Sequence, residues 1–274
     1  MKKFKTIALL FPALFIVLGF FVGGMVLSAA NSLPFTTYAK VFADTEVRAA
    51  LVFTLSLAMV ATGFSALCGT VMALLVHSFA RNSYTMRIFL QIPLSIPHLA
   101  AALILLSLIA PSGLVARLLV SNPQDFPVFV GDGFGIGIVI AYIFKETPFI
   151  AMVVLATLAR TGDELVRVAQ NLGANRWQTF RYVTLPVVTP ATAFSSLFVF
   201  AYIFGAFEIP LILGRQYPTV LAIVANRKFS GTDLEERPEA FAIAVVMTLA
   251  AAVFVWFYLR LGQKQGEAER PVLF

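Results

Sequence analysis

Residues 163–186 read DELVRVAQNLGANRWQTFRYVTLP, a polar, arginine-bearing stretch that lies between two long apolar segments of the chain. Its spacing predicts two short helices joined at a Leu172-Gly173-Ala174 turn. Both helices would carry apolar residues that are unfavourable in water, and these are Val166, Ala169, Leu172, Trp177, Phe180 and Val183. Such a pair suits a groove on a partner protein. The alternative is that it rests on the ends of the chain's own membrane spans.

The turn residues of this stretch have specific conformational roles. Gly173 permits a left-handed backbone that ends the first helix. Asn175 can cap the second helix, which is expected to finish near Tyr182. Pro186 is then expected to stop that helix before the next apolar segment begins.

Composition sets the solvent of the whole chain. Hydrophobic residues make up 59% of its 274 residues and charged residues only 12%, which is typical of an integral membrane protein. A bilayer core of about 30 Å needs roughly 20 apolar residues in a helix, and the apolar segments are long enough. We therefore predict an all-α polytopic membrane protein, one transmembrane domain over 1–274, with six spans at about 7–29, 49–79, 88–110, 135–158, 187–213 and 240–261.

The distribution of Lys and Arg predicts the orientation, because positively charged loops stay in the cytoplasm. With both termini inside, the inner side holds Lys2, Lys3, Lys5, Arg81, Arg87, Arg160, Arg167, Arg176, Arg181, Arg260, Lys264 and Arg270. The outer side holds Lys40, Arg48, Arg117, Arg215, Arg227, Lys228 and Arg237. This bias places the N-terminus, the C-terminus and the 163–186 stretch in the cytoplasm. The net charge of +6 then reflects topology and does not indicate a nucleic-acid partner.

The spacing of the 163–186 stretch resembles the cytoplasmic EAA loop of the permease subunits of binding-protein-dependent ABC importers. That loop has a Glu-Ala-Ala triplet, a glycine six residues after the first triplet position, and an aliphatic-x-Leu-Pro ending ten residues further on. Here the corresponding positions hold Arg167, Val168 and Ala169, then Gly173, then Val183, Leu185 and Pro186. Two of the three triplet positions depart from the pattern, and Arg167 stands where an acidic residue is usual.

The resemblance implies a type I (MetI-like) permease fold, multi-pass in the bacterial cytoplasmic (inner) membrane, with residues 159–186 as the coupling loop. In that family the loop docks on an ABC ATPase dimer, which uses ATP and Mg, while the permease is a non-catalytic transport subunit that binds no cofactor or metal. A second permease, usually a different chain that completes a heterodimer, and a periplasmic or extracellular solute-binding protein complete the assembly. The expected ATPase-coupling residues are Arg167, Val168, Ala169, Leu172, Gly173, Ala174, Trp177, Phe180, Leu185 and Pro186.

The resemblance covers most of the chain and suggests a cargo. LQIPLSIPHLAAALILL at 90–106, FKETPFIAMVVLATLA at 144–159 and FGAFEIPLILG at 204–214 look like the polyamine (spermidine/putrescine) subgroup of these permeases. That subgroup implies a polyamine or another small organic cation as the solute. The neighbouring subgroups for iron, sulfate and phosphonate remain alternatives. The chain contains no G-x-x-x-x-G-K-[ST] phosphate loop, so the ATPase must be another subunit.

Ionisable residues inside predicted spans are candidates for the translocation pathway. Placing a charged side chain at the bilayer centre costs at least ~2.5 kcal/mol unless it has an ionic partner or faces water. Lys145 and Glu146 are sequence neighbours, so they point in different directions on a helix and each needs another partner. Glu208 could attract a cationic solute, with Tyr202 and Phe207 lining the path. A structural Glu208–Lys145 salt bridge is the equally weighted alternative. Gln91, His98, Ser195 and Ser196 could also face the passage.

The sequence lacks the features typical of two other function classes, an intramembrane enzyme and an ATPase-independent transporter or channel. An intramembrane enzyme would need a nucleophile with a base, or metal ligands, and the two histidines, His77 and His98, come without such a motif. A single cysteine, Cys68, excludes a disulfide framework within the chain. An ATPase-independent secondary transporter or channel commonly shows symmetry-related repeats, and no clear repeat is visible in this sequence.

Overall fold

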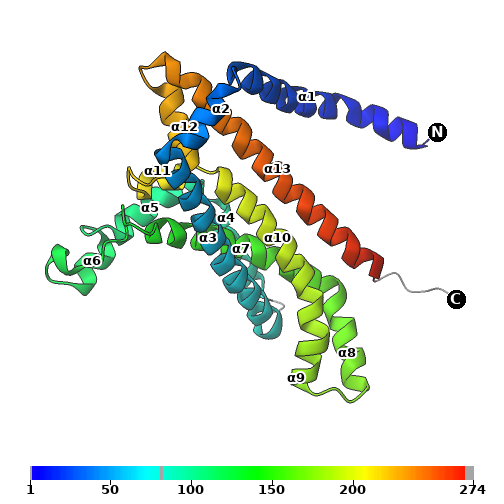
Figure 1. Ribbon diagram of the computed structural model, residues 1–274. Coiled ribbons are helices and arrows are strands. Elements are labelled where there is room, and N and C mark those ends of the chain that lie inside the picture. Colours follow the sequence, from blue (N-terminus) through cyan, green and yellow to red (C-terminus); the bar gives the residue numbers. More distant parts are fainter. Residues whose placement is uncertain (1, 81–82, 269–274) are drawn as a thin grey trace.

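The computed structural model describes residues 2–80 and 83–268, and within these ranges the chain folds into helices and connecting turns (Figure 1). The first part holds α1 (Lys2–Asn31), α2 (Thr36–Ala43), α3 (Thr45–Phe79), α4 (Tyr84–Ser95), α5 (His98–Ile109), α6 (Leu114–Leu119) and η1 (Pro123–Asp125). The second part holds α7 (Ile136–Thr157), η2 (Leu158–Gly162), α8 (Asp163–Asn171), α9 (Arg176–Thr179), η3 (Phe180–Thr184), α10 (Leu185–Gly205), α11 (Glu208–Leu213), α12 (Leu221–Ser230), η4 (Leu234–Glu236) and α13 (Arg237–Ala268). Residue 1 and residues 269–274, which the predicted topology places in the cytoplasm, lie outside the described ranges.

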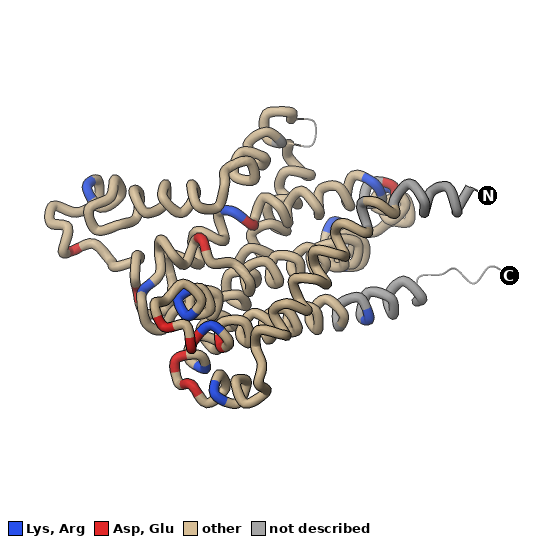
Figure 2. The backbone as a smooth tube through the Cα atoms, turned by 90° about the horizontal axis from the view of Figure 1, so that it is seen from above, with Lys and Arg blue, Asp and Glu red and all other residues tan. Residues whose placement is uncertain are grey.

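The all-α membrane fold is confirmed. Among the described residues, five helical segments are long and apolar enough to cross a membrane, and there are up to six if Phe15–Asn31 of α1 and α2, bent by 86° at their junction, count as one span. Lys, Arg, Asp and Glu gather at helix ends and loops and are scarce along the long helices (Figure 2). α8 and α9 lie at one end of the molecule and α11 and α12 at the other, as the predicted inner and outer sides require (Figure 1).

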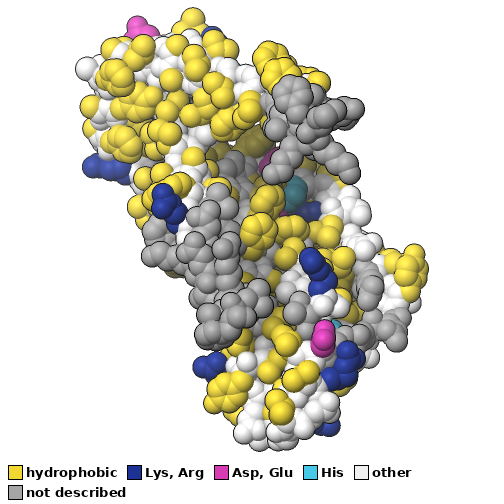
Figure 3. Space-filling view, turned by 90° about the vertical axis from the view of Figure 1, so that its right-hand side faces the viewer, with side chains coloured by type: hydrophobic (Ala, Val, Ile, Leu, Met, Phe, Trp, Pro, Cys, Tyr) yellow, Lys and Arg dark blue, Asp and Glu magenta, His cyan; other side chains and the backbone are white. Residues whose placement is uncertain are grey.

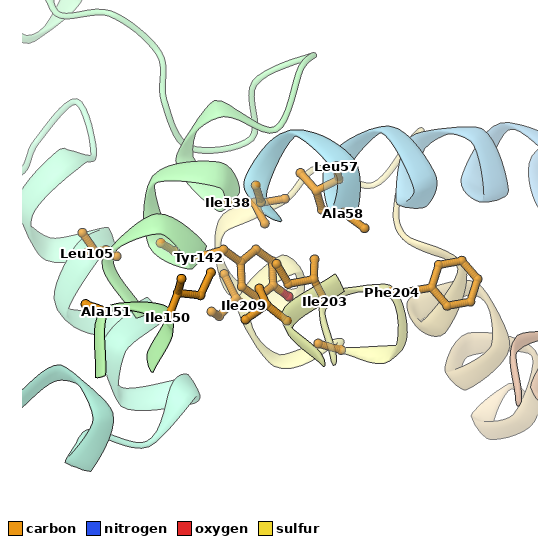
Figure 4. Close-up of a cluster of buried hydrophobic side chains, with 14 of the residues drawn as sticks. Leu57, Ala58, Leu105, Ile138, Tyr142, Ile150, Ala151, Ile203, Phe204 and Ile209 are labelled. Carbon is orange, nitrogen blue, oxygen red and sulfur yellow. The ribbon is translucent and has the colours of Figure 1, made fainter. Parts of the chain in front are cut away.

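The core forms where α3, α7 and α10 pack together. Small residues along α3, among them Ala58, Ala61 and Ala73, let α7 approach closely, as is typical of helix pairs in membranes. Tyr142 of α7 fills the centre between α3 and the α10–α11 segment, with Leu57, Ile138, Ile203 and Ile209 around it (Figure 4). Thr70 and Thr192 add an interhelical hydrogen bond of 2.9 Å between α3 and α10.

Two of the predicted spans are broken helices. The segment predicted as 88–110 divides into α4 and α5 at Ile96, because Pro97 lacks an N–H and disfavours helical backbone in the residue before it. The segment predicted as 187–213 divides into α10 and α11 at Ala206 and Phe207. Hydropathy does not predict such helix breaks, because it reports how apolar a segment is and not whether its backbone stays helical.

The prediction that Pro186 stops the second helix of the loop was wrong. α9 and η3 run on into α10, so that one helical segment extends over Arg176–Gly205. Pro186 lies in the first turn of α10, where its missing N–H is tolerated. The turn before it is a π-helix in which the Leu185 N–H donates to the Phe180 carbonyl, and this wider turn accommodates the proline.

Candidate functional site

The turn between α8 and α9 is closed by backbone geometry that the sequence requires. Gly173 has a φ of +86°, a left-handed conformation that suits glycine. The Gly173 N–H donates to the Gln170 carbonyl at 3.0 Å, and the Ala174 N–H donates to the Ala169 carbonyl at 3.0 Å. These two bonds form a Schellman motif, which satisfies the last carbonyls of α8. The turn is therefore a defined corner between the two helices.

The start of α9 is equally well fixed. The Asn175 side chain accepts from the Gln178 N–H and the Gln178 side chain accepts from the Asn175 N–H, both at 2.9 Å. This reciprocal capping box confirms the predicted Asn175 cap and aligns the second helix. The rings of Trp177 and Phe180 lie 5.9 Å apart on the same segment. The helix pair is thus a small, internally braced unit at the predicted cytoplasmic end.

The predicted coupling residues divide between two faces of this unit. The outer face exposes large apolar side chains, with Leu172 83%, Trp177 69% and Val168 50% exposed, and Arg167 lies beside them. The other predicted members are half-buried, except for exposed Gly173 and Pro186, and these are Ala169, Ala174, Phe180 and Leu185. Val168 lies on α8, Leu172 follows the last residue of α8, and Trp177 lies on α9. We call these three exposed apolar residues the coupling face.

The inner face of the helix pair contacts the chain itself. Val166, Thr179 and Phe180 border a cavity of about 360 Å³ that also touches Leu74 and Leu75 of α3. Thr179 is buried and donates to the Asn175 carbonyl at 2.9 Å. One face of the helix pair therefore lies against the chain's own spans, as one of the two interpretations expects, and whether the exposed face binds a partner stays a prediction.

Lys145 is buried in α7 and binds the break between α4 and α5. Its Nζ donates to the carbonyls of Pro93 and Ile96, both at 2.6 Å. In a continuous helix the Pro93 carbonyl would accept from the N–H of residue 97, but Pro97 has none. The lysine therefore satisfies carbonyls that the proline leaves open, and its charge is held within the fold.

Glu146, the neighbour of Lys145, points to a different partner. Its Oε1 lies 3.3 Å from Nε2 of His98, at the first residue of α5. The His98 ring also lies 4.7 Å from the Tyr202 ring of α10. His98 thus links α7 and α10 through contacts that sequence reasoning missed; its position directly after the Pro97 break was the available signal. One face of the molecule shows a hollow containing histidine and charged side chains (Figure 3).

Glu208 lies half-buried at the start of α11, where a carboxylate suits the positive end of a helix. Phe207 precedes it as the N-terminal cap residue. Within residues 2–80 and 83–268, no ion pair joins Glu208 to Lys145, so the structural salt bridge weighed from the sequence is not formed. Ser195 donates to the Ala191 carbonyl at 2.8 Å and is satisfied locally. Among the described residues, no group of three or more His, Cys, Asp or Glu could hold a metal ion.

A second polar cluster lies at the opposite end from the coupling face. Lys228 of α12 is buried and its Nζ lies 2.8 Å from Glu239, 3.4 Å from Asp44 and 3.7 Å from Glu236. Burial alone would lower the pKa of Lys228, but the hydrogen bond to Glu239 and the charges of Glu239, Glu236 and Asp44 outweigh it and raise that pKa above its ordinary value. This cluster ties α12 to the α2–α3 corner and to α13.

Comparisons with known proteins agree with this architecture. The family model described as "Binding-protein-dependent transport system inner membrane component" matches residues 65–266. The chain is 31% identical over 235 residues to the inner membrane ABC transporter permease protein YnjC of Escherichia coli K12, covering 83% of this chain but 44% of that longer protein. It is 27% identical over 259 residues to the sulfate transport system permease protein CysT of the same organism, covering 94% and 90% of the two chains.

A solved structure shares the fold. It is a crystal structure of a bacterial ABC transporter involved in the import of the acidic polysaccharide alginate, with a TM-score of 0.77, 21% identity, and coverage of 96% of this chain and 99% of that chain. At this identity the likeness concerns the fold, and it includes nearly the whole helical arrangement described above.

Proposed function

The chain belongs to the family of binding-protein-dependent transport system inner membrane components, and we propose that it forms half of a solute pathway that a cytoplasmic ATPase dimer drives through the coupling face. It is a permease subunit of an ABC importer. In this proposal the partner ATPase binds ATP and Mg²⁺, and the permease supplies the moving helices. A solute-binding protein delivers the cargo at the outer end, and a second permease, of the same or a different sequence, completes the pathway.

The observation that carries the proposal is the apolar coupling face on a braced helix pair. Val168, Leu172 and Trp177 project from the end of the molecule where Arg160, Arg167, Arg176 and Arg181 also lie. Aromatic and aliphatic side chains so exposed are typical of protein-binding sites. Because η3 joins the pair to α10 without a break, a force on the coupling face is transmitted directly to a membrane span.

Cysteine crosslinking tests the proposal directly. Cys68 is the single cysteine of the sequence, so Cys68→Ser gives a cysteine-free background. In that background, Leu172→Cys should crosslink to an engineered cysteine in the groove of the partner ATPase. Leu234→Cys is the matched control, because Leu234 is also exposed but lies in η4 at the opposite end. Equal crosslinking of both variants, or none from Leu172→Cys in an active complex, contradicts the assignment.

For the cargo, we propose sulfate or a similar small oxyanion. Support comes from the relative that the chain matches along nearly its full length, which is named a sulfate transport permease. Sulfate was an alternative on the sequence, and the polyamine assignment has no comparable support among the named relatives.

Polyamine import stays a second candidate because of one observation. Glu146, Glu208 and Tyr202 place two carboxylates and an aromatic ring on neighbouring helices, and the Lys145 ammonium group is directed at the carbonyls of Pro93 and Ile96. Competition separates the two cargoes. Uptake of labelled sulfate into vesicles holding the complete complex should be inhibited by excess unlabelled sulfate and unaffected by spermidine. Inhibition by spermidine, with labelled spermidine taken up, favours the cation.

A further inference from the structure

Arg215, in the loop between α11 and α12, carries a buried polar atom without a partner. Its Nε is inaccessible and no acceptor lies within hydrogen-bond distance in the described structure. Its guanidinium lies against Gly133, so closely that a Cβ on that glycine would come 3.3 Å from Nη1. A buried donor without an acceptor is costly and uncommon in folded proteins. The Arg215 side chain as a whole is half-buried, so its guanidinium is still accessible to a ligand from outside the chain.

Beside Arg215 lies a cavity of about 360 Å³ that is large enough for a small anion. Its polar lining comes from Arg215, Gln216, Thr219 and Arg227, and its apolar lining includes Pro210 and Ile223. Guanidinium, amide and hydroxyl groups all donate hydrogen bonds, and this is the donor set that an oxyanion needs. The cavity is lined by the end of α11, the start of α12 and the loop between them, at the end of the molecule opposite α8 and α9 (Figure 1).

The charge balance around the cavity leaves Arg215 in excess. Arg227 is neutralised by an ion pair with Glu46. Asp132 lies next to Gly133 in the sequence, but its carboxylate accepts from the N–H groups of Phe134 at 2.8 Å and Gly137 at 3.5 Å. No described carboxylate forms an ion pair with Arg215. Arg215 is therefore a cation lining the cavity that no ion pair engages within the described structure.

We propose that this cavity binds a small oxyanion, with Arg215 as its principal ligand and Arg227, Gln216 and Thr219 completing the site. A free ion such as sulfate or phosphate and the phosphate of a lipid headgroup share this chemistry. Because the site lies within this chain, its binding of an anion can be measured without the ATPase. Failure of this test would leave the importer assignment unaffected.

The test uses the full chain in nanodiscs of uncharged phosphatidylcholine and measures equilibrium binding of radiolabelled sulfate at constant ionic strength. Arg215→Gln should bind sulfate about tenfold to a hundredfold more weakly than the unchanged chain, as loss of a charge-assisted hydrogen bond predicts. Arg48→Gln is the matched control, because it removes the same charge from the same end and should bind normally. Arg48 is exposed and contacts Thr45.

Further variants separate a lost ligand from a misfolded chain. Arg215→Lys keeps the charge and should retain part of the affinity. Gly133→Ala keeps every ligand side chain but adds a methyl group 3.3 Å from Nη1, so the guanidinium must shift by a few tenths of an ångström. Binding should weaken in a chain that remains monodisperse. A parallel series in nanodiscs with phosphatidylglycerol identifies the source: competition of that lipid with sulfate, lost in Arg215→Gln, assigns the site to headgroups. Equal sulfate binding by the unchanged chain and Arg215→Gln overturns the proposal, and so does no binding in either lipid.

Discussion

The Nζ of Lys145 lies 2.6 Å from the carbonyl oxygen of Pro93, across the gap between α7 and the end of α4. Pro97 creates the need for this contact and Lys145 meets it, although the two residues lie far apart in the sequence. A charge in the middle of a membrane span is often a sign of a solute pathway. Here its hydrogen bonds identify it as part of the architecture that holds a broken helix.

Replacing Lys145 with methionine should therefore destabilise the protein. The variant leaves the Pro93 and Ile96 carbonyls without their donor, at an expected cost of about 2–4 kcal/mol. Thermal unfolding of the purified chain in detergent measures the loss. Lys145→Arg is the control, since a guanidinium can also donate to two carbonyls and should restore most of the stability. If methionine is tolerated without loss, the lysine has no structural role.

Gly173→Ala should impair coupling without a steric clash. No atom lies within 4 Å of the position that a Cβ would occupy, so the cost comes from the backbone at φ +86°. That cost is roughly 1–2 kcal/mol, enough to lower the population of the correct turn by about 5–30-fold. Solute-stimulated ATP hydrolysis by the complex should fall, while Gly173→Asn, which tolerates this conformation better, should fall less. Identical stimulation in glycine, alanine and asparagine forms contradicts a role for the turn geometry.

Trp177→Ala should weaken ATPase binding and leave the permease stable. An exposed aromatic anchor at an interface is worth about 2 kcal/mol or more, corresponding to roughly 30-fold in affinity. The side chain is 69% exposed in the isolated chain, so unfolding should shift by no more than about 0.5 kcal/mol. Titration of the ATPase onto the nanodisc-held permease gives the affinity, with Leu234→Ala as the control at the other end. Unaltered affinity would remove Trp177 from the coupling face.

Sequence reasoning captured the elements that depend on local signals. The glycine turn and the Asn175 cap each follow from a few neighbouring residues, and the structure has both. Of the apolar segments, the third differs, since the qualifying helical segment is His98–Leu119 where 88–110 was predicted. Pro186 shows the limit of such reasoning, because whether a proline ends a helix depends on the turn before it. The π-turn at Phe180–Thr184 has no simple sequence signature.

The polar contacts inside the membrane depend on tertiary packing and were less predictable. The sequence indicated that Lys145 and Glu146 need separate partners, and this is correct. It did not indicate which partners. The Pro93 carbonyl, which lacks a donor because of Pro97, and the His98 ring come close to α7 only in the folded chain. The sequence indicated only that Arg215 is one of several charged residues on the outer side. That its Nε lacks an acceptor depends on how the chain folds around it.

The cluster around Lys228 should make stability depend on alkaline pH. Its pKa is raised above the ordinary 10.5, so the folded state holds the proton more tightly than the unfolded chain does. The stabilisation is therefore complete below about pH 10.5 and is lost as the pH rises through the folded-state value. The difference in unfolding temperature between the unchanged chain and Lys228→Met should be constant from pH 7 to 10 and shrink above this range. A difference that grows with alkaline pH contradicts the assigned ion pairs.

Glu208→Gln should distinguish an anion pathway from a cation pathway. The substitution removes a charge while keeping the size of the side chain, and no ion pair of Glu208 within the described chain is broken by it. A carboxylate about 10 Å from a passing sulfate dianion repels it by roughly 1–3 kcal/mol at an effective dielectric constant of about 20–80, so sulfate uptake by the variant should be maintained or raised. Labelled uptake into vesicles at matched complex density gives the rates, with Glu235→Gln in the outer loop as the control. If sulfate uptake collapses in a correctly assembled complex, Glu208 supports the cargo and does not repel it. Spermidine uptake that falls on the same substitution would instead assign the pathway to a cation.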